Sequence, residues 1–368
     1  MLRRSPYSVN LVQSYGLWKI CPSKTLNKRK CFYRRVFGKK YCIVTNSQSL
    51  EKNSTIILSV FLFSLTLWGK TINNPTDMAK KTFPPSELII NDDGSAFHLH
   101  LRPEQLADRV ILVGDPGRVP TVASHFSEQE CEVSSREFHS ITGTYQGKRI
   151  TVLSTGIGCD NIDIVMTELD ALANIDFATR TEKDEHRTLT IVRIGTCGGL
   201  QPFTPTGSFI ASVKSIGFDG LLNYYAGRNE VCDLQMEEVF KIHMNWTSLK
   251  GSPYVAIANP ELIEQIAQDD MVRGYTISCG GFYGPQGRQI RLKIQDPDQN
   301  AKVETFEYDG MKICNFEMES SALAGLSSLL GHRAMTCCMV IANRYTTEMN
   351  TNYKNTIDTL IQNVLNRI

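Results

Sequence analysis

Apolar runs of strand length alternate with amphipathic stretches over residues 78–368. Most of the apolar runs end in glycine or in a polar residue. The expected strands are 109–114, 149–158, 188–199, 275–284 and 333–344. Amphipathic helices are expected at 119–126, 161–173, 320–330 and 353–365. Strands that alternate with helices predict an α/β fold, in which helices wrap a mixed or parallel sheet and ligands lie at the carboxyl ends of the strands.

Residues 1–77 differ from the rest of the chain. They hold 13 basic and 2 acidic residues and show no helical periodicity. The uncharged run Ile56–Trp68 is shorter than the ~20 apolar residues of a membrane-spanning helix, and it lies too far from the first residue for a secretory signal. We therefore expect a basic extension that is not part of the natural protein, with Met78 as the natural start and residues 78–368 as one domain. A membrane anchor is the alternative.

Charge and cysteine usage narrow the class of protein. Residues 78–368 hold 26 basic and 36 acidic residues, a net charge of −10, which argues against a nucleic-acid-binding surface. The eleven cysteines are scattered without a Cys-x-x-Cys pair, so we expect buried thiols in a reducing, cytoplasmic compartment. The seven histidines form no ligand-spaced pair with carboxylates or cysteines, and no metal site is predicted.

Three expected strand ends are rich in glycine, and two of them carry arginine. They are Gly114–Arg118, Ser154–Gly158 and Arg193–Gly199. Glycine lets backbone N–H groups approach a ligand, and arginine offers a planar fork to phosphate oxygens. Each glycine turn alone would also fit an ordinary strand-to-helix corner. An arginine inside an apolar strand, however, needs an anionic partner. None of the three is a dinucleotide or Walker motif, so no nucleotide cofactor is indicated.

Two further segments carry candidate binding groups. The loop around Phe282, Gln286 and Arg288 combines a ring, an amide and a guanidinium, which suit a heterocycle with carbonyls and an N–H; a polar surface loop is the alternative. Glu317 and Glu319 precede a helical run, where Glu319 would accept from the vicinal hydroxyls of a ribose and Glu317 would orient nearby arginines. An anion site, a diol site and a heterocycle site together indicate a nucleoside plus phosphate.

The motifs GDPGRV, REF, STGIG, RIGTCGG, FYGPQGR, FEMESSAL and VIANR occur in this order. In these motifs the chain resembles the nucleoside phosphorylase-I superfamily, and within it the uridine phosphorylases, from about Ser86 to the last residue. The resemblance implies a single-domain three-layer α/β/α fold with a central mixed sheet flanked by helices. It also implies a pentosyltransferase of pyrimidine salvage that converts uridine and phosphate reversibly into uracil and ribose 1-phosphate. Inorganic phosphate is then a co-substrate, and no cofactor is expected.

The resemblance assigns roles to individual residues. The implied phosphate ligands are Gly114, Arg118, Arg193, Thr196 and, from a neighbouring subunit, Arg136. The implied ribose ligands are Glu317, Met318, Glu319 and, again across a subunit boundary, His98. The implied base ligands are Phe282, Gln286, Arg288 and Arg344. Of these, the residues expected to act on the reacting groups are Arg118, Arg193, Gln286 and Arg288.

The shared ligands imply a homo-oligomer built from dimers, and members of the family are usually hexamers. Asn161 stands where some members have a serine associated with a monovalent cation, so no ion is predicted there. Purine-specific relatives carry an aspartate in the segment Ala342–Arg344, and its absence favours a pyrimidine. A water-using nucleosidase would not need three phosphate arginines, and a membrane-anchored nucleoside-binding protein would explain the apolar run but not the phosphate residues.

Overall fold

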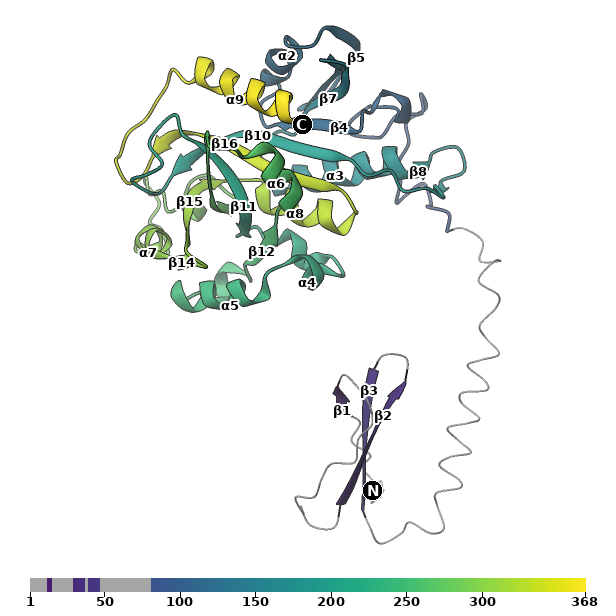
Figure 1. The fold of residues 1–368 in the computed structure, drawn as a ribbon, viewed down its shortest axis with the longest axis vertical. Helices are drawn as coiled ribbons and strands as arrows, with labels where there is room; N and C mark the ends of the chain where they lie inside the picture. The colour runs from purple at the N-terminus through teal and green to yellow at the C-terminus, as the bar shows by residue number, and fades with distance from the viewer. Residues whose placement is uncertain (1–11, 15–28, 37–38, 47–80) are drawn as a thin grey trace. The chain divides into compact units, whose positions relative to one another are not determined.

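The computed structural model describes residues 12–14, 29–36, 39–46 and 81–368. The chain divides into two compact units, Met1–Ala79 and Lys80–Ile368, which are described separately. In the first unit, the antiparallel strands β1 (Val12–Ser14), β3 (Lys39–Asn46) and β2 (Arg29–Val36) form a sheet in that order (Figure 1). The apolar run Ile56–Trp68 and Met78 lie outside the described residues, so the interpretation of residues 1–77 as an extension stays a prediction.

A mixed sheet of eleven strands organises residues 81–368 (Figure 1). Its hydrogen-bonded order is β14, β15, β13, β11, β16, β10, β4, β7, β6 and β5, and β12 pairs with β11. The strands are β4 (Arg109–Val113), β5 (Glu128–Ser135), β6 (Phe138–Tyr145), β7 (Lys148–Ser154), β10 (Thr190–Gly199), β11 (Phe209–Gly217), β12 (Tyr254–Ile257), β13 (Met271–Ser278), β14 (Glu307–Tyr308), β15 (Met311–Glu317) and β16 (Arg333–Asn343). The pairs β4–β7, β4–β10, β10–β16, β11–β13 and β13–β15 are parallel. A separate short pair joins β8 (Ile175–Asp176) to β9 (Thr181–Glu182).

Part of the sheet closes on itself. Strand β15 pairs not only with β13 but also with β10, where Gly198 lies opposite Phe316 and Gly199 opposite Asn315. The strands β10, β16, β11, β13 and β15 therefore form a closed ring. The pairing of β15 with β10 brings Glu317, the last residue of β15, to the side chain of Arg193 on β10.

Helices cover both faces of the sheet, and the continuous apolar runs of the strands reflect this. On β4, Val110 and Leu112 belong to the core beneath α3 and α8, whereas Ile111 and Val113 belong to the core beneath α2, α6 and α9. A third core packs α5 and α7 against β12, β13 and β15. The helices are α2 (Arg118–Ala123), α3 (Cys159–Asn174), α4 (Arg228–Val231), α5 (Leu234–His243), α6 (Pro260–Ile266), α7 (Gln299–Thr305), α8 (Ser320–Leu329) and α9 (Lys354–Arg367). The 3-10 helices are η1 (Pro103–Gln105), η2 (Leu221–Tyr224), η3 (Ser248–Lys250) and η4 (Gly284–Gln286).

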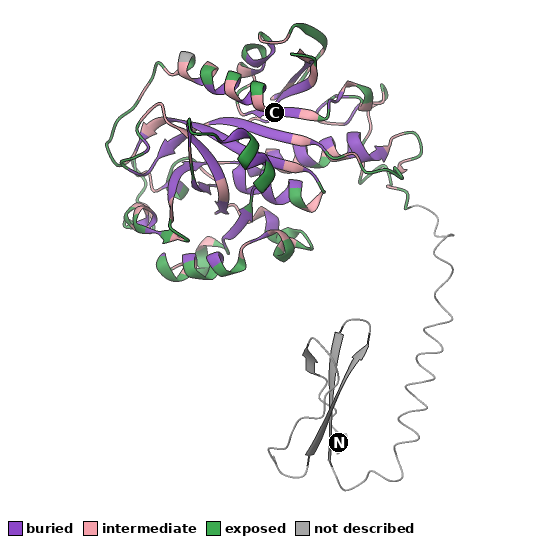
Figure 2. Cartoon of the chain, in the orientation of Figure 1, coloured by how far each residue is buried: buried purple, intermediate pink, exposed green. Residues whose placement is uncertain are grey.

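This arrangement confirms the predicted α/β fold with a mixed sheet between helices. Figure 2 shows the strands largely buried, with exposed residues concentrated on the outer helices such as α5 and α6. The predicted strand 275–284 is wrong in its second half, because β13 ends at Ser278 and two glycines, Gly280 and Gly281, follow before η4. The predicted strand 149–158 likewise ends at Ser154. The sequence pattern did not single out β11 or the hairpin of β5 and β6.

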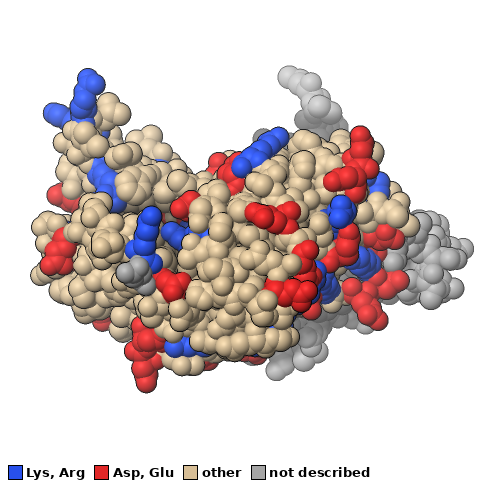
Figure 3. All heavy atoms as spheres, turned by 90° about the horizontal axis from the view of Figure 1, so that it is seen from above, with Lys and Arg blue, Asp and Glu red and all other residues tan. Residues whose placement is uncertain are grey.

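The surface charges and the cysteines of residues 81–368 agree with what the composition predicts. On the face drawn in Figure 3, acidic side chains are interspersed with lysine and arginine. All eight cysteines of this part of the chain are free, and seven of them are buried, as expected; Cys131 is half-buried. None of the helices in the described residues combines the length and the apolar character that crossing a membrane requires.

Candidate active site

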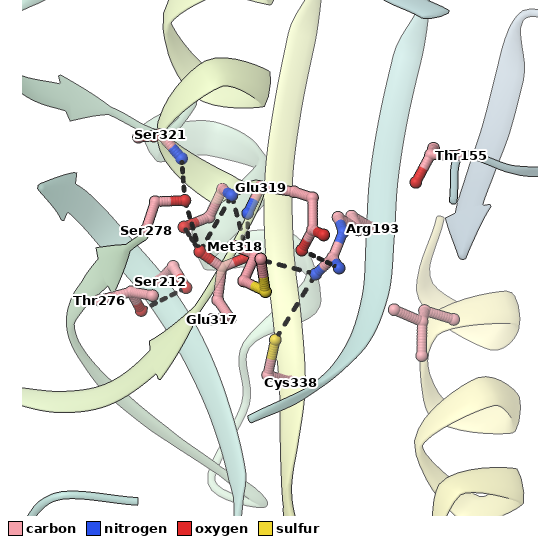
Figure 4. Close-up of polar contacts among 12 residues, drawn as sticks. Thr155, Arg193, Ser212, Thr276, Ser278, Glu317, Met318, Glu319, Ser321 and Cys338 are labelled. Atoms are coloured by element: carbon pink, nitrogen blue, oxygen red, sulfur yellow. Dashed lines mark hydrogen bonds and ion pairs between the residues drawn. The ribbon is translucent and has the colours of Figure 1, made fainter. Parts of the chain in front are cut away.

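Arg193 lies at the centre of the candidate site (Figure 4). Strand β10 places it inside the protein, with 4% of the residue exposed. Its Nη1 lies 3.3 Å from Glu317 Oε2 and 3.8 Å from Cys338 Sγ, and its Nη2 donates to Glu319 Oε2. Burial lowers the pKa of Arg193, but the charges of Glu319 and Glu317 outweigh burial and raise that pKa above its usual range. The side chain is therefore a buried cation shared by two carboxylates.

Glu317 closes the corner between β15 and α8. Its Oε1 accepts from the hydroxyls of Ser278 at 2.7 Å and Ser320 at 2.6 Å, and its Oε2 accepts from the backbone N–H groups of Glu319 and Ser320, both at 2.9 Å. The first amides of a helix have no partner within the helix, and a carboxylate at this end is favoured electrostatically. Glu317 therefore fixes the start of α8 and orients Arg193, and its oxygens are nearly saturated by the protein.

Glu319 has fewer partners than Glu317. Its Oε1 accepts from the backbone N–H of Gly158 at 2.7 Å, and its Oε2 pairs with Arg193. Gly158 has a φ of 103°, a conformation that favours glycine and turns this N–H toward the carboxylate. Burial raises the pKa of Glu319, and the charge of Arg193 only partly offsets this. Of the two carboxylates, Glu319 is therefore the one that can accept further hydrogen bonds from the hydroxyl groups of a ligand.

A second arginine approaches Arg193 from the end of β4. Arg118 begins α2, and its Nη1 donates to the carbonyl oxygen of Ile194 at 3.2 Å. A Cβ atom on Gly114 would lie 3.8 Å from Arg193 Nη2, so the backbone after β4 passes directly beside this guanidinium. Burial lowers the pKa of Arg118, and the charge of Arg193 lowers it further. The structure thus brings Gly114, Arg118 and Arg193 together, and half-buried Thr196 follows three residues along β10.

The loop after β13 carries the expected base ligands. Gln286 is buried, with 3% of the residue exposed, whereas Phe282 is 47% exposed. The guanidinium of Arg288 lies 4.0 Å from the centre of the Phe282 ring. Helix α7 supports the loop from beneath, because Gln299 Nε2 donates to the carbonyl oxygen of Pro285 at 2.7 Å. The amide, the guanidinium and the ring are therefore held within one supported turn.

Arg344 lies close to this loop from the end of β16. Within residues 81–368, its Nε and Nη2 are buried without a hydrogen-bond partner, and so is the Nε of Arg288. Burial, and then the positive charge of Arg288, lower the pKa of Arg344 to about 10, which leaves it a cation at neutral pH. Unpaired buried donors are costly in free energy, so this pair of guanidiniums suits a ligand that presents carbonyl oxygens.

His98 and Arg136 form a separate group. Arg136 has a φ of 55° in the turn between β5 and β6, is exposed, and lies over the ring of Phe97 at 5.8 Å. His98 Nδ1 lies 2.6 Å from Glu168 Oε1, so in the neutral ring Nδ1 donates and Nε2 is left as an acceptor. Within residues 81–368, neither side chain has a hydrogen bond or ion pair to Arg118, Arg193, Glu317 or Glu319. Neither residue is therefore bonded to the cluster around Arg193 in its own chain.

A cavity of about 660 Å³ lies beside the base loop, lined among others by Phe218, Trp246, Arg288 and Leu292. It shares Tyr283, Gly284, Pro285 and Arg288 with the loop but includes neither Arg193 nor the two glutamates, so it is not the centre of the predicted chemistry. Among the described residues, no three histidine, cysteine or acidic side chains gather as metal ligands would.

Three residues that contact the site were not identified from the sequence. Ser278 and Ser320 donate to Glu317, and Cys338 contacts Arg193. A polar residue at the end of an apolar strand, as at Ser278, and the serine pair after Glu319 were the available signals. Nothing in the local sequence distinguishes Cys338 from the other buried thiols, since its role depends on the neighbouring strand.

The geometry can be set against known proteins. The family model described as "Phosphorylase superfamily" matches residues 108–367. The chain belongs to this superfamily. A uridine phosphorylase of Thermococcus kodakarensis is 29% identical over 275 residues, which is 72% of this chain and 84% of that protein. A uridine phosphorylase of Haemophilus influenzae is 30% identical over 253 residues, 67% of this chain and 86% of that protein.

A solved structure within the phosphorylase superfamily extends these matches. The nucleoside phosphorylase of Trypanosoma brucei, whose description states uridine phosphorylase activity, is 28% identical and superposes with a TM-score of 0.69, covering 76% of this chain and all of that one. Purine nucleoside phosphorylases of the DeoD type also match, at 25–26% identity. The fold and the family are thereby shown, and the choice of base depends on the site itself.

Proposed function

We propose that this protein is a uridine phosphorylase, a pentosyltransferase that converts uridine and phosphate reversibly into uracil and ribose 1-phosphate. The observation that carries the proposal is the buried Arg193 between Glu317 and Glu319, with Arg118 beside it. A cation next to an available carboxylate can hold an anion and a diol at adjacent positions. The named activities of the Thermococcus, Haemophilus and Trypanosoma relatives support the same substrates.

On the sugar side, substrate binding exchanges the partners of an ion pair. Phosphate takes donors of Arg193 and Arg118, and Glu319, released from Arg193, accepts from the 2′- and 3′-hydroxyls of the ribose while Met318 packs against the sugar. Breaking the glycosidic bond leaves positive charge on the ribose, as in glycoside cleavage. The bound phosphate is then both the nucleophile and the opposing charge, so no protein nucleophile is required.

On the base side, the departing uracil gains negative charge. Arg288 and Arg344 carry unpaired donors into this region, and the amide of Gln286 can pair with an adjacent carbonyl and N–H. Interactions that strengthen as charge develops raise turnover more than they tighten substrate binding. The segment Ala342–Arg344 lacks the aspartate that purine-specific relatives carry there, which supports a pyrimidine over a purine.

Charge balance supports a site shared between subunits. Within one chain, Arg118 and Arg193 are matched by Glu317 and Glu319, so the cluster has no excess positive charge for a phosphate dianion. Arg136 of a partner subunit would supply a third guanidinium. Arg136 is exposed in a left-handed backbone conformation, which is costly for arginine and is often retained for function. We propose a homo-oligomer built from dimers, a hexamer in its full form, in which His98 crosses the same boundary. A cytoplasmic location stays a prediction.

The test follows the fate of uridine with and without phosphate. Uridine absorbance should fall only when phosphate is present, and uracil and ribose 1-phosphate should appear in equal amounts. Loss of uridine without phosphate would indicate a nucleosidase instead. Turnover of inosine but not uridine would indicate a purine phosphorylase. Nucleoside binding with no turnover of either would leave only the non-catalytic binding protein.

A further inference from the structure

A polar cluster made of half-buried Asp219 and two buried hydroxyls lies behind the two glutamates and is not part of the proposed chemistry. Asp219 follows β11, Tyr254 begins β12, and Ser321 lies in the first turn of α8. The hydroxyl of Tyr254 donates to Asp219 Oδ1 at 2.9 Å, and the hydroxyl of Ser321 donates to Asp219 Oδ2 at 2.9 Å. The hydroxyl oxygens of Tyr254 and Ser321 are themselves 3.0 Å apart. We call these three residues the Asp219 triangle.

The Asp219 triangle is an ordered arrangement, because its donors and acceptors match. Both hydroxyl protons can be accepted by the carboxylate, whose Oδ1 also accepts the backbone N–H of Leu221 at 2.8 Å. Tyr254 and Ser321 are fully buried. Burial, followed by the charge of Asp219, raises the pKa of Tyr254 well above its usual value, so the phenol stays a donor. An amide in place of the carboxylate would offer one acceptor oxygen instead of two.

Ser321 connects this triangle to the ribose corner. Its backbone N–H donates to Ser278 Oγ at 3.2 Å, and Ser278 Oγ donates to Glu317 Oε1 (Figure 4). Its hydroxyl also lies 3.8 Å from Cys159 Sγ, which donates to the carbonyl oxygen of Met318 at 3.2 Å. The first turn of α8 is thus held on one side by Glu317 and on the other by Asp219. Glu319 is the residue that immediately precedes this turn.

We propose that Asp219 is a positioning residue for the sugar: acting through Ser321, it fixes the first turn of α8 so that Glu319 presents its carboxylate to the ribose diol. This inference rests on the proposed function. Asp219 reaches the ligand only through another residue, so it is not itself catalytic. Because the hydroxyl at the 2′ position distinguishes ribose from deoxyribose, the triangle determines how strongly the site prefers a ribonucleoside.

The test compares two serines on one helix. Ser321→Ala removes the link to Asp219, and Ser327→Ala removes a hydroxyl of α8 that donates only to the carbonyl oxygen of Ala324, at 3.1 Å. Both serines are buried. The measurement is kcat/KM for uridine divided by kcat/KM for 2′-deoxyuridine. Ser321→Ala should lower this ratio about fivefold, the effect of roughly one hydrogen bond, while Ser327→Ala leaves it unchanged. A purely structural role would lower both substrates together and leave the ratio constant.

A second pair tests the other arm of the triangle. Tyr254→Phe removes a buried hydroxyl of the triangle, and Tyr275→Phe removes an equally buried one that donates to the carbonyl oxygen of Tyr308 at 3.0 Å, outside it. Tyr254→Phe and Asp219→Asn should shift the ratio in the same direction as Ser321→Ala. If Asp219→Asn and Ser321→Ala both keep the unaltered ratio, the positioning role is wrong.

Hydrogen exchange separates this inference from the proposed function. In the full chain, the backbone amides of Ser320 and Ser321 should exchange at least several-fold faster in Ser321→Ala than in Ser327→Ala. Equal exchange in the two variants would overturn the positioning role whether or not uridine is the substrate. Faster exchange in a protein that does not consume uridine would keep the role of Asp219 and refute the proposed function alone.

Discussion

Exchanging each glutamate of the site for glutamine should separate stability from turnover. Glu317→Gln is expected to destabilise the fold strongly, whereas Glu319→Gln should destabilise it less and lower uridine phosphorolysis. The two carboxylates contact the same arginine and differ by two positions in the chain. The contrast therefore depends on what else each carboxylate holds.

The magnitude follows from the contacts. Glutamine at position 317 keeps one oxygen acceptor and replaces the other oxygen with an NH₂ group. Some of the hydroxyl and backbone N–H donors that bind Glu317 would then face another donor. Ser278 and Ser320 can rotate their hydroxyls, but Arg193 loses the charge of one partner. Removing one member of a buried ion pair costs about 3–5 kcal/mol, a large part of the ~5–15 kcal/mol that stabilises a typical domain.

Glu319 differs because the fold already disfavours its charge. Its pKa is raised in the folded protein, chiefly by burial, so the folded state binds its proton more tightly than the unfolded state does. The contribution of Glu319 to the free energy of unfolding is therefore fully present below its pKa in the unfolded chain. It is lost as the pH rises through the raised pKa of the folded protein. A neutral glutamine avoids that loss, which offsets part of the cost of removing one partner of Arg193, so we expect Glu319→Gln to lower the free energy of unfolding less than Glu317→Gln does. Turnover should fall at least tenfold, since a charged acceptor of the diol is lost.

The assay is urea unfolding of both variants at one protomer concentration, with initial rates of uridine phosphorolysis measured in parallel. A fixed concentration matters because assembly adds to apparent stability. Equal destabilisation by the two substitutions would refute the division of roles. So would a stable Glu317→Gln protein with normal rates.

Three further outcomes are expected. Arg136→Ala should be inactive yet folded, whereas Arg193→Ala should be inactive and less stable, because it leaves Glu317 and Glu319 without their buried cation; mixing the two variants under subunit exchange, at a temperature at which both are folded, should restore part of the activity, and no recovery after proven exchange would rule out a shared site. Arg288→Ala should lower kcat for uridine about ten- to a hundredfold, because a bond to a charged group is worth about 1.5–3 kcal/mol, whereas Arg291→Ala, an exposed neighbour, should not; equal effects would remove the base-reading role. A chain that begins at Met78 should keep full activity, and loss of folding would show that residues 1–77 belong to the enzyme.

Much of the fold was predictable because the central strands are buried on both faces. Strand β4 is an unbroken apolar run followed by glycine, and β10 is an apolar run interrupted by Arg193 that ends in glycines; both are found where the pattern places them. Strand β5 alternates between exposed and half-buried residues and carries three glutamates, so its apolar signal is weak. The extent of β13 was overestimated because Cys279, Phe282 and Tyr283 continue its apolar character into a loop.

The candidate site was predictable as a set of residue types but not as a set of contacts. Arginine within an apolar strand indicated a buried anionic partner, and Glu317 and Glu319 are those partners. The local sequence carries no trace of the Asp219 triangle, because its members come from three elements that meet only in the folded chain. Hydrogen bonds between distant elements leave no periodicity to read.

The pairing of strand β15 with β10 has a consequence for the order in which the parts of the protein fold. The two strands are joined by more than one hundred residues of chain, and contacts so distant in sequence form late and slowly during folding. Until β15 pairs with β10, Glu317 and Glu319 are not held beside Arg193. After dilution from denaturant, the helical circular-dichroism signal should therefore return before enzymatic activity does. A substitution that weakens the pairing of Gly198 with Phe316 should lengthen this delay without changing the turnover rate of the fully refolded enzyme.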